Sequence, residues 1–299
     1  TSIIVLIILL VTITILPFVS RIIKDALLRQ QQNHLESVRN LVIKLFDDYQ
    51  SKVTNYTKLF RNDREIKDSL VYHTELAGER EHPLAAIKRF YKSFDVSSIE
   101  IGDSRGRVVA IAEKQDVYDN DRSGDWLIKS SLHGKIASGN VISGEGPIIK
   151  ASAPIYYNEN QLIGTITSGI LVDDSQLLKI KQLSNTDIVI TDNYGRTISS
   201  TFKNGSLKDR PDSGSLVMTF PFSDPSGTVV GKIMILQEDR LPLIIARTQI
   251  TLLLLLTGIF AASVFLLFLV LNKVMKPIVR LKEGVEKIGK GDFGYRIDI

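Results

Sequence analysis

An uncharged apolar stretch from Ile250 to Leu271 constrains this chain more than any other feature of its sequence. It reads ITLLLLLTGIFAASVFLLFLVL and contains no Asp, Glu, Lys or Arg. A helix that rises ~1.5 Å per residue crosses a bilayer in about 20 apolar residues. A buried helix of a soluble protein is the alternative, but such helices rarely exceed ~14 unbroken apolar residues and keep a polar face. The stretch therefore predicts a membrane-spanning helix within residues 247–272.

Basic residues directly after this stretch predict its orientation. They are Lys273, Lys276, Arg280, Lys282, Lys287 and Lys290. The positive-inside rule places such a cluster in the cytoplasm, so the residues before the span are expected outside. The formal net charge of the chain is only +4, and much of it comes from this cluster. No nucleic-acid partner is expected from so mild a charge.

A second apolar stretch, from Ser2 to Val19, opens the chain. A signal peptide is the alternative, but its apolar core has only ~7 to 15 residues and ends in small residues. Here Arg21 to Lys24 follow and make a poor cleavage site. We expect an uncleaved first membrane helix in residues 1–20. The two spans leave roughly 225 residues between them, enough for one large or two small domains.

The region from Arg21 to Val71 contains no Gly or Pro and predicts one long helix over residues 21–72. A seven-residue a/d pattern runs along it, formed by Leu28, Leu35, Val38, Val42, Leu45, Tyr49, Tyr56 and Leu59. We expect this face to pair with a second copy of the chain in a homodimer. The flanking residues Leu41, Phe46, Val53 and Phe60 would then cover a sheet. An amphipathic helix that simply lies on one domain is the alternative.

The residues that follow predict an α+β module. A short helix is expected over 84–94 and another over 125–137, which contains the only tryptophan, Trp126. Strand-like runs with turn residues between them cover 98–101, 107–112, 141–142, 148–157 and 162–172. About five antiparallel strands with one inserted helix form the arrangement of a PAS-like domain.

A second, smaller sheet is expected after a helix over 173–183. Its strand-like runs cover 187–191, 196–201, 215–222 and 228–237. A pattern D-x-x-G followed by a basic residue occurs at Asp103 and again at Asp192, which is a weak internal repeat. Residues 240–249 then lead as a helix into the second span.

No residues point to catalysis, and neither a cofactor nor a metal site is predicted. The chain has no Cys, which excludes disulfides and thiolate chemistry. It has neither a phosphate-binding loop nor a nucleophile elbow. The four histidines are scattered without ligand spacing. Asp119 to Gly124 matches the first half of a calcium loop, but Ser130 stands where a bidentate Glu is needed, so a solvated loop is favoured.

After the second span, apolar residues recur at alternating steps of four and three, which is coiled-coil spacing. Pro277 begins this helix and Gly289 to Asp292 end it. An interfacial amphipathic helix is the alternative. The stretch NKVMKPIVRLKEGVEKIGKGDF resembles the first helix and connector of a HAMP domain, with Pro277, Leu281 and Gly291-Asp292 at its marker positions. We expect a partial HAMP domain in residues 273–299.

The region between the spans resembles a double Cache domain. The resemblance is carried by IEIGDSRGRVVAIAE, DNDRSGDWLIKSSLHG, KASAPIYYNENQLIGTITSGILVDDSQL and DIVITDNYGRTISST. It implies an α+β fold in which two transmembrane helices flank a PAS-like extracytoplasmic domain with a long N-terminal helix. The membrane-distal module would cover residues 73–183 and the membrane-proximal module residues 184–246.

The same resemblance implies a ligand in the distal module, between the sheet and the helix that carries Trp126. Arg122, Tyr156 and Asp173 would then lie near Trp126, although an ordinary core tryptophan is the alternative. Lys150 is added on physical grounds, because a cation on a central strand is costly unless an anion meets it. Double Cache domains that bind amino acids have Arg two residues before the Trp and Tyr after it, whereas this chain has Gly124 and Leu127.

These features together predict a transmembrane signal-transduction receptor in a bacterial inner membrane. Its sensor domain would be periplasmic or extracellular and its HAMP helix cytoplasmic. A small molecule would be sensed outside by a homodimer, and the signal relayed to an output domain beyond the chain, a histidine kinase being expected. The front end of a diguanylate or adenylate cyclase, a chemotaxis receptor, and a membrane-anchored protein-binding module without signalling are the alternatives.

Overall fold

The computed structural model describes residues 2–76, 78–202, 215–224, 226–238 and 241–289, except for the side chains of 2–16, of 215 and of some positions after 240. The chain divides into two compact units. One consists of Gln32–Asp239, and the other of Thr1–Gln31 together with Arg240–Ile299.

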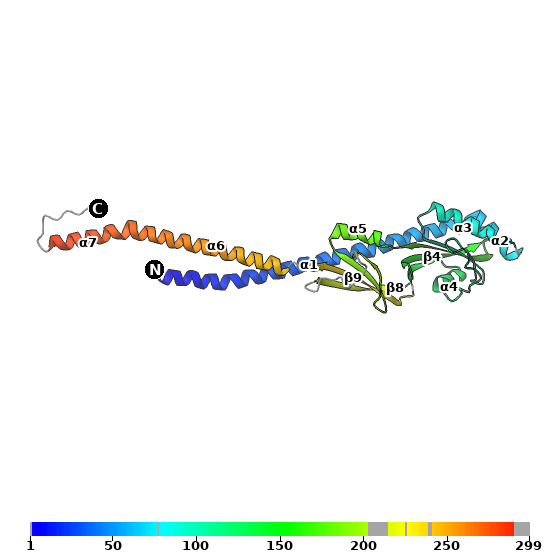
Figure 1. Cartoon of the computed structure of the whole chain (residues 1–299), viewed down its shortest axis with the longest axis horizontal. Helices are drawn as coiled ribbons and strands as arrows, with labels where there is room; N and C mark the ends of the chain where they lie inside the picture. The colour runs from blue at the N-terminus through cyan, green and yellow to red at the C-terminus, as the bar shows by residue number, and fades with distance from the viewer. Residues whose placement is uncertain (1, 77, 203–214, 225, 239–240, 290–299) are drawn as a thin grey trace. The chain divides into compact units, whose positions relative to one another are not determined.

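The unit Gln32–Asp239 contains two antiparallel sheets (Figure 1). The first has the order β2-β1-β5-β4-β3 and consists of β1 (Ser98–Asp103), β2 (Val108–Ile111), β3 (Ala137–Ser143), β4 (Gly146–Tyr156) and β5 (Leu162–Leu171). The second has the order β7-β6-β9-β8 and consists of β6 (Asp187–Asp192), β7 (Thr197–Ser200), β8 (Ser215–Ser223) and β9 (Val229–Glu238). In each sheet the first hairpin pairs with the last strand, so the second repeats the first without β3. The expected smaller second sheet is confirmed.

One kind of turn closes a hairpin three times, and it accounts for the D-x-x-G repeat. In each copy an Asp Oδ1 accepts the backbone N–H groups two and four residues later, at 2.8–2.9 Å. The glycine three residues after the Asp is left-handed, with φ between 79° and 86°, where a side chain would be strained. The copies begin at Asp103, Asp192 and Asp224. The copy at Asp224 did not match the repeat seen in the sequence, because Thr228 follows its glycine where the other two copies have a basic residue.

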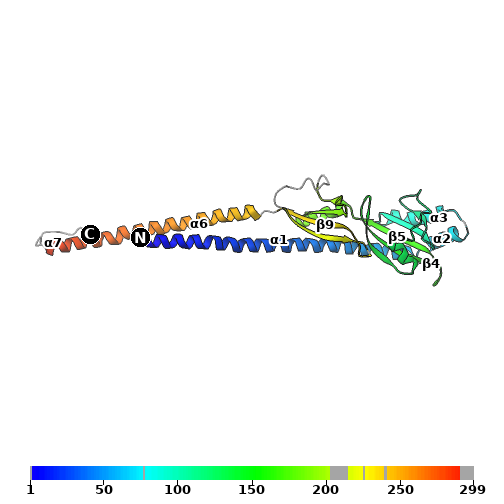
Figure 2. The same cartoon turned by 90° about the horizontal axis from the view of Figure 1, so that it is seen from below.

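Helix α1 (Ser2–Phe60) packs on both sheets of this unit (Figure 2). Leu35, Val38 and Val42 are each at most 4% exposed and pack with apolar residues of both sheets. This part of the predicted dimer face is therefore buried in its own chain, and the alternative of an amphipathic helix lying on one domain is right for these three residues, whereas Leu59 of the same face is 52% exposed. Leu41, expected to cover a sheet, is 45% exposed.

The long helix also ends earlier than predicted. After Phe60 the chain turns, and a second helix, α2 (Arg64–Glu75), begins. Asp63 causes the break without Gly or Pro, because its Oδ1 accepts the backbone N–H of Ile66 at 3.1 Å and so caps α2. Helix α3 (Glu81–Ser93) follows α2, and both pack on the first sheet beside Phe60.

Helix α4 (Trp126–Leu132) lies on the opposite face of the first sheet from α2 and α3 (Figure 1). It is shorter than the helix predicted over 125–137, because it ends at the left-handed Gly134 and β3 begins at Ala137. Helix α5 (Asp174–Ser184) connects the two sheets.

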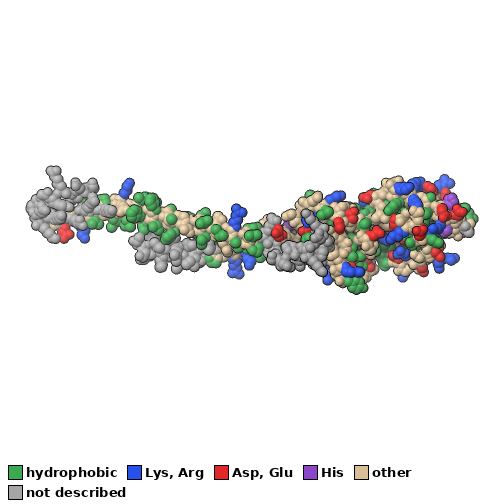
Figure 3. Space-filling view, viewed as in Figure 1, with side chains coloured by type: hydrophobic (Ala, Val, Ile, Leu, Met, Phe, Trp, Pro, Cys, Tyr) green, Lys and Arg blue, Asp and Glu red, His purple; other side chains and the backbone are tan. Residues whose placement is uncertain are grey.

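The unit of Thr1–Gln31 and Arg240–Ile299 is helical where it is described. It contains the start of α1, then α6 (Leu241–Val270), a π-helical turn η2 (Leu271–Met275) and α7 (Lys276–Gly289). Among the residues described with side chains, one helical run, Pro242–Glu286, is long and apolar enough to cross a membrane, and hydrophobic side chains line the visible face of α6 in Figure 3. The predicted first span lies mostly on residues whose side chains are outside this description. Gly291 and Asp292 of the predicted HAMP connector are also outside it.

Replacing Phe60 should reveal how strongly the end of α1 holds the first sheet. Phe60 is fully buried, with ring centroids 4.5 Å from Phe90 and 5.1 Å from Phe94. We expect Phe60→Ala to lower the unfolding free energy of residues 32–239 by about 3–5 kcal/mol, because a cavity forms. The matched control is Leu59→Ala, since Leu59 is 52% exposed. Urea denaturation followed by circular dichroism measures both, and equal losses would contradict this packing.

Candidate functional site

The face of the first sheet that carries α4 is polar. Side chains alternate along a strand, so Ile99 and Ile101 face the apolar cluster under α1, and Glu100 between them faces α4. Glu100 pairs across the strands with Thr167, and Thr167 pairs with Ser152. The next row on this face holds Lys150. We call this face, with Glu100, Lys150, Ser152, Thr165 and Thr167, the polar face.

Helix α4 is held on the polar face by buried hydroxyl groups. Ser131 of α4 donates a hydrogen bond to Ser152 Oγ at 2.9 Å, and Thr167 donates to the same oxygen at 3.0 Å. Ser131 and Ser152 are fully buried. Asp125 starts the helix by accepting the backbone N–H of Leu127 at 2.9 Å. Because buried hydroxyls are stable only when paired, this contact fixes where α4 lies.

Room for the Lys150 side chain comes from Gly169, which pairs with it on the neighbouring strand. A Cβ at residue 169 would lie 3.3 Å from Lys150 Cγ and 2.5 Å from Ser98 Oγ. A larger residue here would therefore clash chiefly with Ser98 and would also crowd the stem of Lys150.

Two glutamates near Lys150 resist ionisation. Burial raises the pKa of the Glu100 carboxyl, Asp125 and Glu113 add to the rise, and Arg122 and Lys150 oppose it. The pKa of Glu113 is also raised by burial of its carboxylate, although the side chain as a whole is exposed. Its Oε2 accepts the backbone N–H of Ile99 at 3.2 Å, which opposes the rise, as does Lys150. Lys150 thus acts electrostatically on both acids.

Thr165 offers a hydrogen-bonding group that is not used within the described chain. Its hydroxyl is fully buried, and among the described residues it has no hydrogen-bond partner. It lies two residues before Thr167 on β5 and so on the same face. Buried polar atoms in native proteins nearly always have a partner, which can be water or a ligand. A water or ligand molecule could supply this partner to Thr165 on the polar face.

The structure brings some of the predicted site residues together. Arg122 and Lys150 both act on the Glu100 carboxyl. Tyr156 lies past the end of α4, since its hydroxyl is 3.0 Å from where a Cβ of residue 134 would be. Trp126 begins α4 and is 43% exposed, so it is not a core tryptophan.

Asp173 does not join this group. Its Oδ1 caps α5 by accepting the backbone N–H groups of Ser175 and Gln176, at 2.8 and 3.3 Å. It also acts electrostatically on Tyr49 of α1 and not on Glu100.

Several residues of the polar face, and two that adjoin it, were missed from the sequence. They are Glu100, Glu113, Ser131, Ser152, Thr165 and Thr167. Glu100 alone had a visible signal, because it is a charge placed between two buried isoleucines of a strand. The hydroxyl residues look like ordinary strand residues until the pairing of β4 with β5 brings them together.

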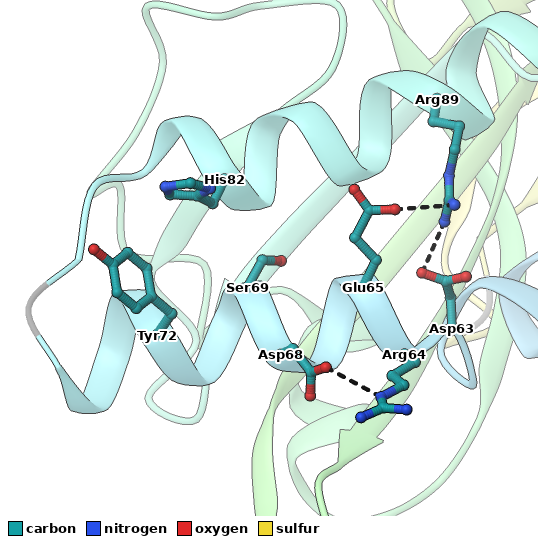
Figure 4. A pocket seen from close by; sticks show the side chains of 8 residues that line it. All are labelled: Asp63, Arg64, Glu65, Asp68, Ser69, Tyr72, His82 and Arg89. Atoms are coloured by element: carbon teal, nitrogen blue, oxygen red, sulfur yellow. Dashed lines mark hydrogen bonds and ion pairs between the residues drawn. The ribbon is translucent and has the colours of Figure 1, made fainter.

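A hollow of about 700 Å³ lies between α2 and α3 (Figure 4). Arg89 bridges Asp63 and Glu65, each at 2.9 Å, and Arg64 pairs with Asp68 at 3.3 Å. Arg89 thus joins α3 to the start of α2, while the Arg64–Asp68 pair lies within α2.

A second hollow of about 660 Å³ lies beside the β1–β2 turn. Two of the three arginines that line it have side-chain partners: Arg107 pairs with Asp119 at 2.9 Å, and Arg80 stacks on Tyr118 at 3.9 Å. Among the described residues no group of His, Asp and Glu could hold a metal ion. On the face of Gln32–Asp239 seen in Figure 3, acidic and basic side chains are interspersed.

The sequence matches no protein-family model, and no curated protein matches it. Several solved structures, however, are similar to this chain. The sensor domain of the histidine kinase DctB of V. cholerae aligns with a TM-score of 0.49 and 14% identity, over 72% of this chain and 98% of that one. The periplasmic domain of LuxQ of Vibrio cholerae aligns with a TM-score of 0.47 and 15% identity, over 68% and 99%.

The sensory domain of the Campylobacter jejuni chemoreceptor Tlp3, solved with isoleucine bound, aligns with a TM-score of 0.46 and 14% identity. That alignment covers 74% of this chain and 96% of Tlp3's. Sensor domains of histidine kinases and chemoreceptors are thus among the structures similar to this chain.

The ionisation of Glu100 should destabilise the unit. Because its pKa is raised in the folded state, its contribution to stability is present below its unfolded pKa of ~4.3 and is lost as the pH rises through the folded pKa. We expect Glu100→Gln to make residues 32–239 more stable than the wild type at neutral pH. The difference should vanish below about pH 4.

Urea denaturation from about pH 4 to 8 measures this effect. Glu159→Gln, at an exposed turn residue, is the control and should leave the profile unchanged. A Glu100→Gln protein that is less stable at neutral pH would show that the carboxylate gains more from Arg122 and Lys150 than it loses by burial.

Proposed function

We propose that this chain is the sensing part of a transmembrane signal-transduction receptor and that a small polar molecule binds the polar face. The observation that carries the proposal is the buried Thr165 hydroxyl without a described partner, on the same face as a carboxyl group that burial makes costly to ionise. Both features lower the stability of the protein alone. A ligand that supplied hydrogen bonds or charge to them would bind favourably.

In this proposal Lys150 and Arg122 bind an anionic group of the ligand, and Glu100 accepts a hydrogen bond from a donor group. Trp126 and Tyr156 contribute aromatic walls near the two ends of α4. Asp173 is left out because its carboxylate caps α5.

Two transmembrane helices, residues 1–20 and 247–272, would carry the sensor on the outside of a bacterial inner membrane. Residues 273–299 would form the start of a cytoplasmic HAMP domain, and two chains would act as a homodimer. Ligand needs only to favour one of two arrangements, with a coupling of ~1–3 kcal/mol. A histidine kinase is the proposed output, with cyclase, chemotaxis and non-signalling protein-binding roles as alternatives.

A ligand screen tests the sensing role. Residues 32–239 are mixed with amino acids, carboxylates, amines and nucleobases, and thermal unfolding is followed. We expect at least one class to raise the midpoint, because binding to the folded state stabilises it. Lys150→Ala should lower the affinity for that ligand about tenfold or more, as expected for a lost charge-assisted hydrogen bond. Lys129→Ala, a substitution at an exposed position of α4, should leave the affinity unchanged. Firm capture of a protein without any small-molecule effect would favour the protein-binding alternative.

Membrane topology can be tested with single cysteines, since the chain has none of its own. Glu159→Cys lies in the exposed β4–β5 turn, and Lys282→Cys lies on the exposed side of α7. A membrane-impermeant maleimide applied to intact cells should label the first and spare the second. Labelling of both after lysis is the control, and the reverse pattern in intact cells would rule out an external sensor.

A further inference from the structure

A fully buried threonine ties α1 to the middle of the first sheet. Thr57 Oγ1 lies 2.5 Å from Ser168 Oγ of β5 and 3.4 Å from the backbone oxygen of Ala151 on β4. Thr57, Ser168 and Ala151 are all 0% exposed. Gln50 Nε2 of α1 also donates to Ser138 Oγ of β3 at 3.1 Å, while the hydroxyl pair is the fully buried directional contact that positions the helix on β4 and β5.

The residues that meet Thr57 are the immediate neighbours of those on the polar face. Ala151 pairs with Ser168, and the next pair along the same strands is Ser152 with Thr167. Successive side chains point to opposite faces, so the first pair faces α1 and the second faces α4. Ser152 and Thr167 are hydrogen-bonded to each other, and Ser152 also to Ser131 of α4. One peptide unit on each strand therefore separates the α1 contact from the polar face.

We propose that Thr57 is a positioning residue that couples α1 to the polar face through Ser168. The proposal rests on the proposed function, since it says how a molecule on the polar face would change α1. A ligand that draws the hydroxyl of Thr167 or Ser152 toward itself shifts the 151–152 and 167–168 peptides. The paired hydroxyls of Ser168 and Thr57 then move with them.

The hydroxyl pair can follow such a shift without losing its hydrogen bonds. Thr57 has one proton and three oxygen neighbours, because the backbone oxygen of Val53 also lies at 2.8 Å. Ser168 can reach the same Val53 oxygen at 3.5 Å. Either hydroxyl can therefore donate to the other while its partner donates elsewhere. Valine at residue 57 would keep the shape and the packing but remove both arrangements.

The test uses the whole chain in lipid nanodiscs and measures hydrogen exchange of the backbone amides of residues 53–61, without any ligand. Ser131→Ala removes a hydroxyl from the α4 side of the sheet, which does not contact α1. We expect it to change the exchange rates of residues 53–61 at least threefold. When Ser131→Ala is combined with Thr57→Val, the exchange rates of residues 53–61 should differ less than twofold from those of Thr57→Val alone. Thr57→Ser keeps the hydroxyl and should restore the response.

Two controls separate coupling from general loss of stability. Ser130→Ala is next to Ser131 on α4, but its hydroxyl bonds only within the helix, to the oxygen of Trp126, and it should leave α1 unchanged. The backbone amides of β9 report on the second sheet, and their exchange rates should not change in Ser131→Ala. Two results would overturn the coupling: exchange rates of residues 53–61 that Ser131→Ala leaves unchanged, or an equal effect of Ser131→Ala with and without Thr57→Val. Neither result would affect ligand binding to the polar face, which the thermal screen measures independently.

Discussion

Burial of the apolar stripe of α1 against both sheets is the interaction on which the unit Gln32–Asp239 depends. Leu35, Val38 and Val42 pack at one part of the helix and Val53 and Phe60 farther along, each at most 4% exposed. A sheet with one bare apolar face is not stable in water, so each sheet needs such a cover. Because one helix supplies part of the cover to both, a displacement of α1 changes the packing of both.

The two faces of the first sheet have opposite character, and the alternation of side chains along each strand is the reason. The face under α1 is filled by isoleucine and alanine, with the Thr57–Ser168 pair as its polar contact near the centre. The face under α4 carries charges and hydroxyls, several of them buried. Buried polar groups of this kind cost stability unless they are paired.

Among the strands that the structure describes, the second sheet repeats the topology of the first without the extra edge strand. The shared Asp-x-x-Gly turns follow from one local geometry, in which an Asp side chain caps a turn that ends in a left-handed glycine. Several polar groups of the second module are used within it: Lys181 pairs with Asp187, and Asp174 accepts hydrogen bonds from Ser199 and Ser200. The buried amide oxygen of Gln237 on β9 has no partner among the described residues.

By itself, the sequence determined the kinds of elements and their order. The uncharged stretch before Leu271, the period-two runs and the Asp-x-x-Gly turns are local signals, because neighbouring residues produce them. Tertiary structure decided which face of α1 is buried, and so removed the predicted dimer face at Leu35, Val38 and Val42. It also decided the site: Glu100, Ser152 and Thr167 are distant in sequence and become neighbours only through strand register, while Asp173 is taken by the cap of α5. Register and helix packing depend on contacts across the whole unit, and no single stretch of sequence contains them.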